Sequence, residues 1–100
     1  MFICGGENVF PSEVEQGLLQ CEGVDEAVVL GEQHRLWGEV GVAFVVCRPG
    51  IILSPDVIMT SCRKHLARYK VPKRIELVDE LPKTATGKIR RGIVQSWLQK

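Results

Sequence analysis

The sequence predicts an α+β fold: a small three-stranded central sheet that is covered by about three helices and preceded by an N-terminal loop or hairpin. Two features lead to this prediction. Three short runs have the apolar patterns of strands, and three other segments carry apolar residues at helical spacing. Their order is loop, helix, strand, strand, helix, strand, loop and helix, which is typical of a sheet with helices packed against it.

The N-terminal segment, residues 1–10, is expected to form a loop or short hairpin, because Gly5-Gly6 interrupts regular structure. A helix should follow from about Ser12 to Gln20. Pro11 suits the first turn of a helix, and the acidic residues after it suit the positive end of the helix dipole. The expected inner face of this helix consists of Val14, Leu18 and Cys21.

Three segments are predicted to be strands. Residues 24–30 and 41–47 are apolar runs, and residues 74–78 alternate well enough to form a third strand. The polar segment 31–39, which contains Trp37, is expected to connect the first two strands outside the core.

Two more helices are predicted in the second half of the chain. The first runs from about Pro55 to Ala67 with Ser54 as its N-cap, and the second spans about residues 89–98. Their expected inner faces are Val57, Ile58, Cys62 and Leu66 in the first helix, and Ile89, Ile93, Val94 and Trp97 in the second.

Charge and composition narrow the classes of function. The formal net charge is +1, which argues against a general nucleic-acid-binding protein, because such domains usually carry a large basic excess. The basic residues are concentrated after Arg63, so an anion-binding face should lie in the C-terminal half. We recognise no signal peptide and no apolar run of membrane-spanning length, and we therefore expect a cytoplasmic protein.

The four cysteines do not have the spacing of a metal site. They contain no CxxC pair, and the two histidines add no zinc-finger pattern, so no metal site is predicted. We interpret Cys21, Cys47 and Cys62 as small apolar core residues that stay reduced.

Near the end of the chain, the stretch PKTATGKIRR places Lys88 directly after a glycine, on a loop of small residues. This is not a P-loop, because Pro82 stands where the first glycine of that motif belongs and Ile89 replaces its hydroxyl residue. The loop therefore lacks the phosphate cradle and the magnesium ligand of a P-loop. Taken alone, the loop indicates either a mobile lysine that binds an anion or a solvated surface lysine.

A second loop marked by glycines, ICGGENVFP, lies near the N-terminus. Gly5 and Gly6 allow backbone or ligand to approach closely, and Glu7 and Asn8 add polar groups beside them. The spacing GxGxxG is absent and no strand is expected before the loop, so a dinucleotide-binding fingerprint is not supported. Taken alone, the loop fits a binding loop or simply the start of the first helix.

Four segments, GGENVFPSEVE, WGE, LARYKVPKRIELVDELP and P-x-x-x-x-GK, occur in this order over nearly the whole chain. Together they resemble the small C-terminal domain of the adenylate-forming enzymes, which comprise acyl- and aryl-CoA ligases, the adenylation domains of peptide synthetases, and luciferases. The first and third segments look most like those of fatty and aryl acid ligases. The resemblance covers residues 1–100, which would form one C-terminal domain.

In that family a large N-terminal domain binds ATP, Mg²⁺ and the carboxylic acid, and the small domain is mobile and serves two half-reactions. The resemblance implies that Lys88 is the catalytic lysine, which reaches the carboxylate and the α-phosphate during adenylation. Thr86 and Gly87 belong to the same loop on the ATP side. A positive charge at this point opposes the repulsion between the two anions that must meet.

For the second half-reaction, the resemblance implies that the small domain presents another face to coenzyme A (CoA), the co-substrate. The GGEN loop and Trp37 would line a pantetheine tunnel, Tyr69 would stack on adenine, and Lys73 would lie near a phosphate. Glu7 either holds the loop in place or acts as a general base, and Trp37 either contacts pantetheine or only packs. The implied acceptor-side residues are Gly5, Gly6, Glu7, Asn8, Trp37, Tyr69 and Lys73.

The large ATP- and acid-binding domain has no counterpart in residues 1–100, and the hinge residue of the family would lie just before Met1. We therefore expect a fragment or excised domain that catalyses nothing alone. Two alternatives remain open: the acceptor is the pantetheine thiol of a holo carrier protein, or the chain is a free-standing module that binds CoA or a protein. Lys88 also resembles the lysine that protein acetyltransferases modify in such ligases.

Overall fold

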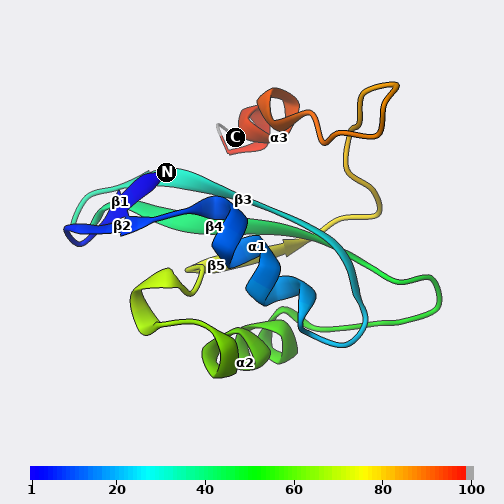
Figure 1. Ribbon diagram of the computed structural model, residues 1–100, viewed down its shortest axis with the longest axis horizontal. Coiled ribbons are helices and arrows are strands. Elements are labelled where there is room, and N and C mark those ends of the chain that lie inside the picture. The colour runs from blue at the N-terminus through cyan, green and yellow to red at the C-terminus, as the bar shows by residue number, and fades with distance from the viewer. Residues whose placement is uncertain (99–100) are drawn as a thin grey trace.

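The α+β prediction is confirmed by a computed structural model, which describes residues 1–98 (Figure 1). Its five strands are β1 (Phe2–Cys4), β2 (Glu7–Val9), β3 (Val24–His34), β4 (Gly38–Cys47) and β5 (Arg74–Leu77). Its helices are α1 (Pro11–Leu19), α2 (Pro55–His65) and α3 (Arg91–Trp97), with a 3₁₀ helix η1 (Arg68–Lys70).

All five strands form one sheet, rather than the three-stranded sheet that was predicted. Strands β3 and β4 make a long antiparallel hairpin, and β4 also pairs with β5 in parallel and with β1. The segment 31–39 is therefore not a simple connection, because β3 continues to His34 and β4 begins at Gly38. Backbone pairing extends the hairpin beyond its buried part, where the apolar pattern no longer marks a strand.

The N-terminal segment is a hairpin in which β1 and β2 are joined by Gly5 and Gly6. Both glycines have positive φ values, 57° and 85°, which a two-residue turn of type I′ requires. Cys4 pairs with Glu7 across this turn and with Gly38 in β4, so the hairpin is joined to the main sheet.

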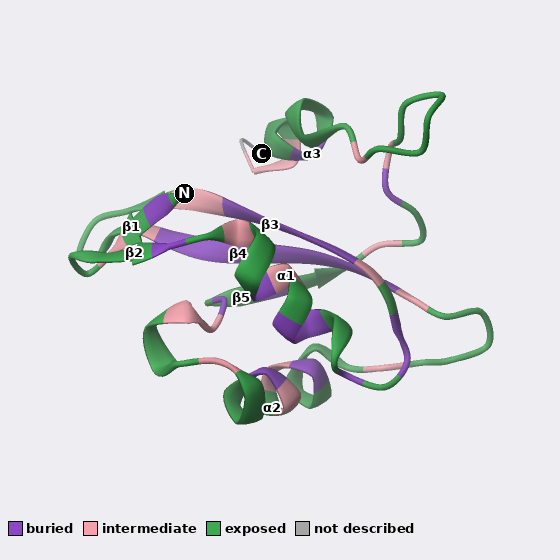
Figure 2. Ribbon diagram, viewed as in Figure 1, coloured by how far each residue is buried: buried purple, intermediate pink, exposed green. Residues whose placement is uncertain are grey.

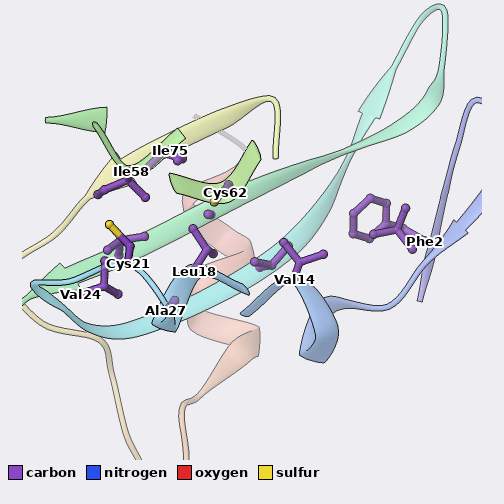
Figure 3. Close-up of a cluster of buried hydrophobic side chains, with 13 residues drawn as sticks. Phe2, Val14, Leu18, Cys21, Val24, Ala27, Ile58, Cys62 and Ile75 are labelled. Carbon is purple, nitrogen blue, oxygen red and sulfur yellow. The ribbon is translucent and has the colours of Figure 1, made fainter. Parts of the chain in front are cut away.

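Helices cover both faces of the sheet (Figures 1 and 2). Along β3, Val29 belongs to the core under α1 and α2, whereas its neighbours Val28 and Leu30 face α3. This alternation explains why both central strands are apolar without interruption. Figure 3 shows side chains of the core under α1 and α2, in which all three residues predicted for the inner face of α1 are buried: Val14, Leu18 and Cys21.

Some details of the helices and cysteines differ from the predictions. Helix α3 begins at Arg91 rather than near Ile89, because Ile89 pairs with Lys83 in an isolated β-bridge. Val57 was expected on the inner face of α2 but is 52% exposed; it lies in the first turn, where its N–H binds the Ser54 side chain at 3.2 Å.

Of the three cysteines that were predicted to be core residues, Cys21 and Cys62 are buried. Cys47 is only half-buried, because it is the last residue of β4 and lies at the edge of the core. All four cysteines are free thiols. Within residues 1–98, no helix is long and apolar enough to cross a membrane, and no cluster of side chains could hold a metal ion.

Candidate functional site

A pocket of about 390 Å³ lies beside the β1–β2 hairpin, and we call it the hairpin pocket. Its walls come from four separate parts of the chain, namely the N-terminal hairpin, the tip of the β3–β4 hairpin, η1 and the segment before β5. The structure thus brings together five residues that the family resemblance had assigned to the acceptor side. The residues that line the pocket are Cys4, Gly5, Glu7, Trp37, Arg68, Tyr69, Val71 and Lys73.

Trp37 is held in this pocket by close contacts with the GG turn. The N–H of Gly5 donates to the carbonyl oxygen of Trp37 at 2.9 Å. A Cβ atom on Gly5 would lie only 3.1 Å from Cε3 of the indole, so a side chain at this position would press on the ring. The ammonium of Lys73 lies 5.5 Å from the indole centroid, which is within the range of a cation–π interaction.

Tyr69 reaches the pocket from η1, and the next residue fixes this short helix to α1. Lys70 forms an ion pair with Glu13, and the hydrogen bond from Lys70 to that carboxylate raises the pKa of the lysine. The Lys70 ammonium also lies 5.6 Å from the centroid of the Tyr69 ring. Tyr69 itself is exposed, so part of its ring is accessible to a flat ligand.

Gly6 and Asn8, the other two residues predicted for the acceptor side, do not line the hairpin pocket. A Cβ atom on Gly6 would meet no atom within 4 Å, so the backbone φ of 85°, rather than crowding, explains glycine there. Asn8 is exposed on β2, where it pairs with Ile3.

A wider groove of about 530 Å³ adjoins the hairpin pocket and shares Arg68, Val71 and Lys73 with it. Arg63 from α2 adds a third cation to this groove, and among residues 1–98 none of the three forms a recorded ion pair. Sequence reasoning noted the basic bias of this half of the chain but did not select Arg63. Only the path of the chain from α2 through η1 places this arginine beside Lys73.

Lys88 is exposed on a short turn between Lys83 and Ile89, and this turn is not the open tether that its small residues suggest. The Thr84 N–H donates to the Lys88 carbonyl at 2.8 Å, and the Gly87 N–H donates to the Thr84 carbonyl at 2.9 Å. The Lys88 N–H also donates to the Thr84 hydroxyl at 3.2 Å. We call residues 84–88 the Lys88 turn; its backbone is ordered by hydrogen bonds while the lysine side chain projects outward.

Ion pairs on both sides of the Lys88 turn fasten it to the rest of the domain. On one side, Lys83 binds Glu26 of β3 at 2.8 Å. On the other side, Arg91 binds both carboxylate oxygens of Glu15 in α1, at 2.9 and 2.8 Å, and donates to the Val29 carbonyl at 3.3 Å. Helix α1 and strand β3 therefore position the segment that carries Lys88.

The Lys88 turn and the hairpin pocket lie at different ends of the molecule. In Figure 1 the turn is part of the orange loop that leads into α3, whereas the blue β1–β2 hairpin lies at the opposite side. Both regions are largely exposed (Figure 2). Any reaction that uses both must therefore use them on two different faces.

Comparisons with known proteins show which family the chain belongs to. The family described as AMP-binding enzyme C-terminal domain matches residues 13–88. The chain is 47% identical over 92 residues to a 2-succinylbenzoate–CoA ligase of Oceanobacillus iheyensis, covering 91% of this chain and 18% of that protein. A Mycobacterium tuberculosis 3-[(3aS,4S,7aS)-7a-methyl-1,5-dioxo-octahydro-1H-inden-4-yl]propanoyl:CoA ligase is also 47% identical, over 91 residues, with coverages of 91% and 18%.

A solved structure of an acyl-CoA synthetase contains a region with the same fold. The Mycobacterium tuberculosis fatty acyl CoA synthetase superimposes with a TM-score of 0.88 at 37% identity, covering 97% of this chain and 19% of that one. The chain therefore spans about a fifth of the length of the proteins that it matches.

Proposed function

Because this chain belongs to the family of AMP-binding enzyme C-terminal domains, we propose that it is the mobile C-terminal domain of an ATP-dependent acid–CoA ligase. Residues 1–100 are one domain of that ligase, and a larger domain outside them binds ATP, Mg²⁺ and the carboxylic acid. The observation that carries this proposal is the separation of the Lys88 turn from the hairpin pocket, which suits two half-reactions on two faces.

Lys88 serves the first half-reaction, in which the carboxylate attacks the α-phosphorus of ATP and pyrophosphate leaves. The attack brings two anions together, and an ammonium held beside them lowers the electrostatic barrier. Thr86 and Gly87 shape the turn that carries the amine: Gly87 has a φ of 87°, and the hydroxyls of Thr84 and Thr86 lie 3.0 Å apart. The acid and ATP reach Lys88 only when the other domain presents them.

The hairpin pocket serves the second half-reaction, in which the thiol of CoA attacks the acyl-adenylate and AMP leaves. Trp37, Gly5 and Glu7, which line the hairpin pocket, border the pantetheine arm, and Gly6 and Asn8 complete the same hairpin outside the pocket. Tyr69 stacks on the adenine ring, because its ring is exposed at the edge of the pocket. Since the two faces are far apart, the domain rotates between the half-reactions.

Free CoA is the acceptor that the charges favour over the pantetheine of a carrier protein. CoA carries phosphates at its nucleotide end, and the groove next to the hairpin pocket holds three cations for which the described residues provide no carboxylate partner: Arg63, Arg68 and Lys73. Phosphate groups are the natural partners of such a cluster. The Arg63→Ala variant should therefore weaken CoA binding without affecting adenylation.

The test uses the full-length protein that contains this domain, with ATP, Mg²⁺ and a panel of aromatic and fatty acids. Exchange of radiolabelled pyrophosphate into ATP reports adenylation, and mass spectrometry after addition of CoA or a holo carrier protein reports thioester formation. We expect exchange that depends on one class of acid, and transfer to free CoA. Transfer to the carrier protein alone would establish the rival acceptor, and a lack of exchange with every acid would overturn the ligase proposal.

The isolated residues 1–100 provide the control that tests whether adenylation requires the other domain. We expect no pyrophosphate exchange from them, because the ATP and acid sites lie in the other domain. Exchange by this chain alone would contradict the proposal. If residues 1–100 bound CoA with micromolar affinity and the full-length protein had no ligase activity, the chain would instead be a free-standing binding module.

A further inference from the structure

The turn that presents Trp37 is organised by a histidine that does not line the hairpin pocket. Residues 35–37 connect β3 to β4, between the paired residues His34 and Gly38. The Nδ1 atom of His34 accepts hydrogen bonds from the N–H groups of Leu36, at 3.1 Å, and of Trp37, at 3.3 Å. An asparagine or aspartate side chain often organises a turn in this way, and here an imidazole does so.

These bonds fix the backbone of Trp37 on both sides. Its N–H is bound by His34, and its carbonyl accepts from the N–H of Gly5 at 2.9 Å. His34 and the GG turn thus hold the same peptide segment from opposite directions. The neighbouring Leu36 is 82% exposed, so its packing contributes little to the conformation of the turn.

The imidazole can accept these bonds only through an unprotonated Nδ1, with its proton on Nε2. Loss of this acceptor leaves two N–H groups at the tip of an exposed hairpin to bind water instead. Because water does not impose one geometry, the turn would then sample several conformations, and the indole would leave its place between Gly5 and Lys73 for part of the time.

We propose that His34 is a positioning residue for the thiol half-reaction: its Nδ1 holds the turn in the conformation that places the Trp37 indole in the hairpin pocket. This inference rests on the proposed function, since it assigns the acceptor thiol to that pocket. It predicts that the identity of residue 34 affects the KM for CoA and leaves adenylation unchanged.

The test replaces His34 in the full-length ligase by asparagine, glutamine and alanine. Asparagine carries an acceptor oxygen at nearly the position of Nδ1, whereas the oxygen of glutamine lies one bond farther out. We expect His34→Ala and His34→Gln to raise the KM for CoA about fivefold, the effect of losing about one hydrogen bond's contribution, and His34→Asn to stay within about twofold of wild type. Pyrophosphate exchange should be the same in all three variants.

His65→Ala is the matched control, because this second histidine is exposed at the end of α2 and has no recorded hydrogen bond from its side chain within residues 1–98. Its KM for CoA should not change. The proposal is overturned if His34→Ala leaves the KM for CoA unchanged, if asparagine and alanine raise it equally, or if adenylation falls in parallel.

A readout without substrates separates this inference from the proposed function. In residues 1–100 carrying Trp97→Phe, acrylamide quenching of the fluorescence reports Trp37 alone, since the chain has two tryptophans. Quenching should increase in the His34→Ala protein and remain near the wild-type value in His34→Asn. Unchanged quenching in His34→Ala overturns the positioning role itself, whereas increased quenching in a protein whose hairpin pocket does not take CoA would count against the proposed function only.

Discussion

The Trp37 turn, which consists of residues 35–37, and the Lys88 turn have similar backbone structures but different surroundings. Each is a short hairpin loop stabilised by a glycine with positive φ, Gly38 at 84° and Gly87 at 87°. In each, a side chain at the start of the loop, that of His34 or Thr84, accepts a hydrogen bond from a backbone N–H. The indole of Trp37 then contacts the GG turn and Lys73, whereas the side chain of Lys88 has no recorded ion pair within residues 1–98.

The difference indicates how much of each site one domain supplies. The hairpin pocket has walls from four segments of this chain, so the domain alone forms the concave surface that we propose as the CoA site. The Lys88 turn provides one charge on an ordered backbone, and among the described residues Lys88 lines neither the hairpin pocket nor the groove beside it. A site of the second kind can work only when another domain provides the remaining surface.

The largest expected effect is at the Lys88 turn, the site that needs another domain. The proposed role of Lys88 predicts that Lys88→Ala in the full-length protein slows pyrophosphate exchange by about 100-fold or more, because the charge proposed to stabilise the transition state is lost. Thioester formation from a synthetic acyl-adenylate and CoA should stay near the wild-type rate. Lys64→Ala, which removes an exposed lysine of α2, is the control. Equal slowing of both half-reactions would show that the two faces do not act separately.

A smaller effect is expected on the completed side, at Gly5. Gly5→Ala should raise the KM for CoA about tenfold, because the new Cβ would lie 3.1 Å from the indole. Gly50→Ala is a matched control: Gly50 also has a positive φ, 79°, but its Cβ would meet nothing within 4 Å. Gly6 also has a positive φ and open space around an added Cβ, so Gly6→Ala should cause backbone strain similar to that of Gly50→Ala and no contact with the indole. If all three variants had the same KM for CoA, the contact between a side chain at position 5 and the Trp37 indole would have no effect on CoA binding.

The ion pairs beside the Lys88 turn should affect stability more than catalysis. Glu15 is only 13% exposed and accepts from both Arg91 and the N–H of Val29, the latter at 2.8 Å. Glu15→Ala should lower the free energy of unfolding by about 1–3 kcal/mol in urea titrations of residues 1–100. Glu32→Ala, which breaks an exposed pair with Arg74, should cost about 1 kcal/mol or less. Similar losses in both variants would argue against a special role for the Glu15 contact.

The smallest effect concerns the buried thiol of Cys62, which lies away from both turns. Burial, and secondarily the nearby Cys21, raises the pKa of Cys62 from 9.0 to about 11. The stabilisation linked to its proton is complete below pH 9 and is lost as the pH rises through 11. At pH 8, alkylation of Cys62 by iodoacetamide, followed by peptide mass spectrometry, should be slower than that of half-buried Cys4 and Cys47. Equal rates at these three thiols would contradict this.

Local patterns sufficed to predict most of the elements. The apolar runs of β3 and β4 and the helical spacing in α1 depend only on residues close in sequence, and Gly5-Gly6 marked the hairpin turn. The polar ends of β3 and β4 were missed, because cross-strand backbone pairing, rather than burial, makes them strands.

The candidate site depended on longer-range information. Family resemblance named Trp37, Tyr69 and Lys73, but no sequence pattern could place them around one pocket, because the parallel pairing of β5 with β4 brings their segments together. The same limit applies to Arg63, and to His34, whose role is visible only through the hydrogen bonds that its ring accepts.

The anchoring of Arg91 to both α1 and β3 has a kinetic consequence. A lysine on a flexible loop would reach its target through independent motion of that loop. Here the Lys88 turn is anchored to a body 38 Å long, so in the proposed ligase the amine would reach and leave its target only as the entire domain moves. In a ligase of the proposed kind, adenylation would therefore be gated by that motion, and solvent viscosity should slow the overall cycle more than it slows the chemistry within either orientation.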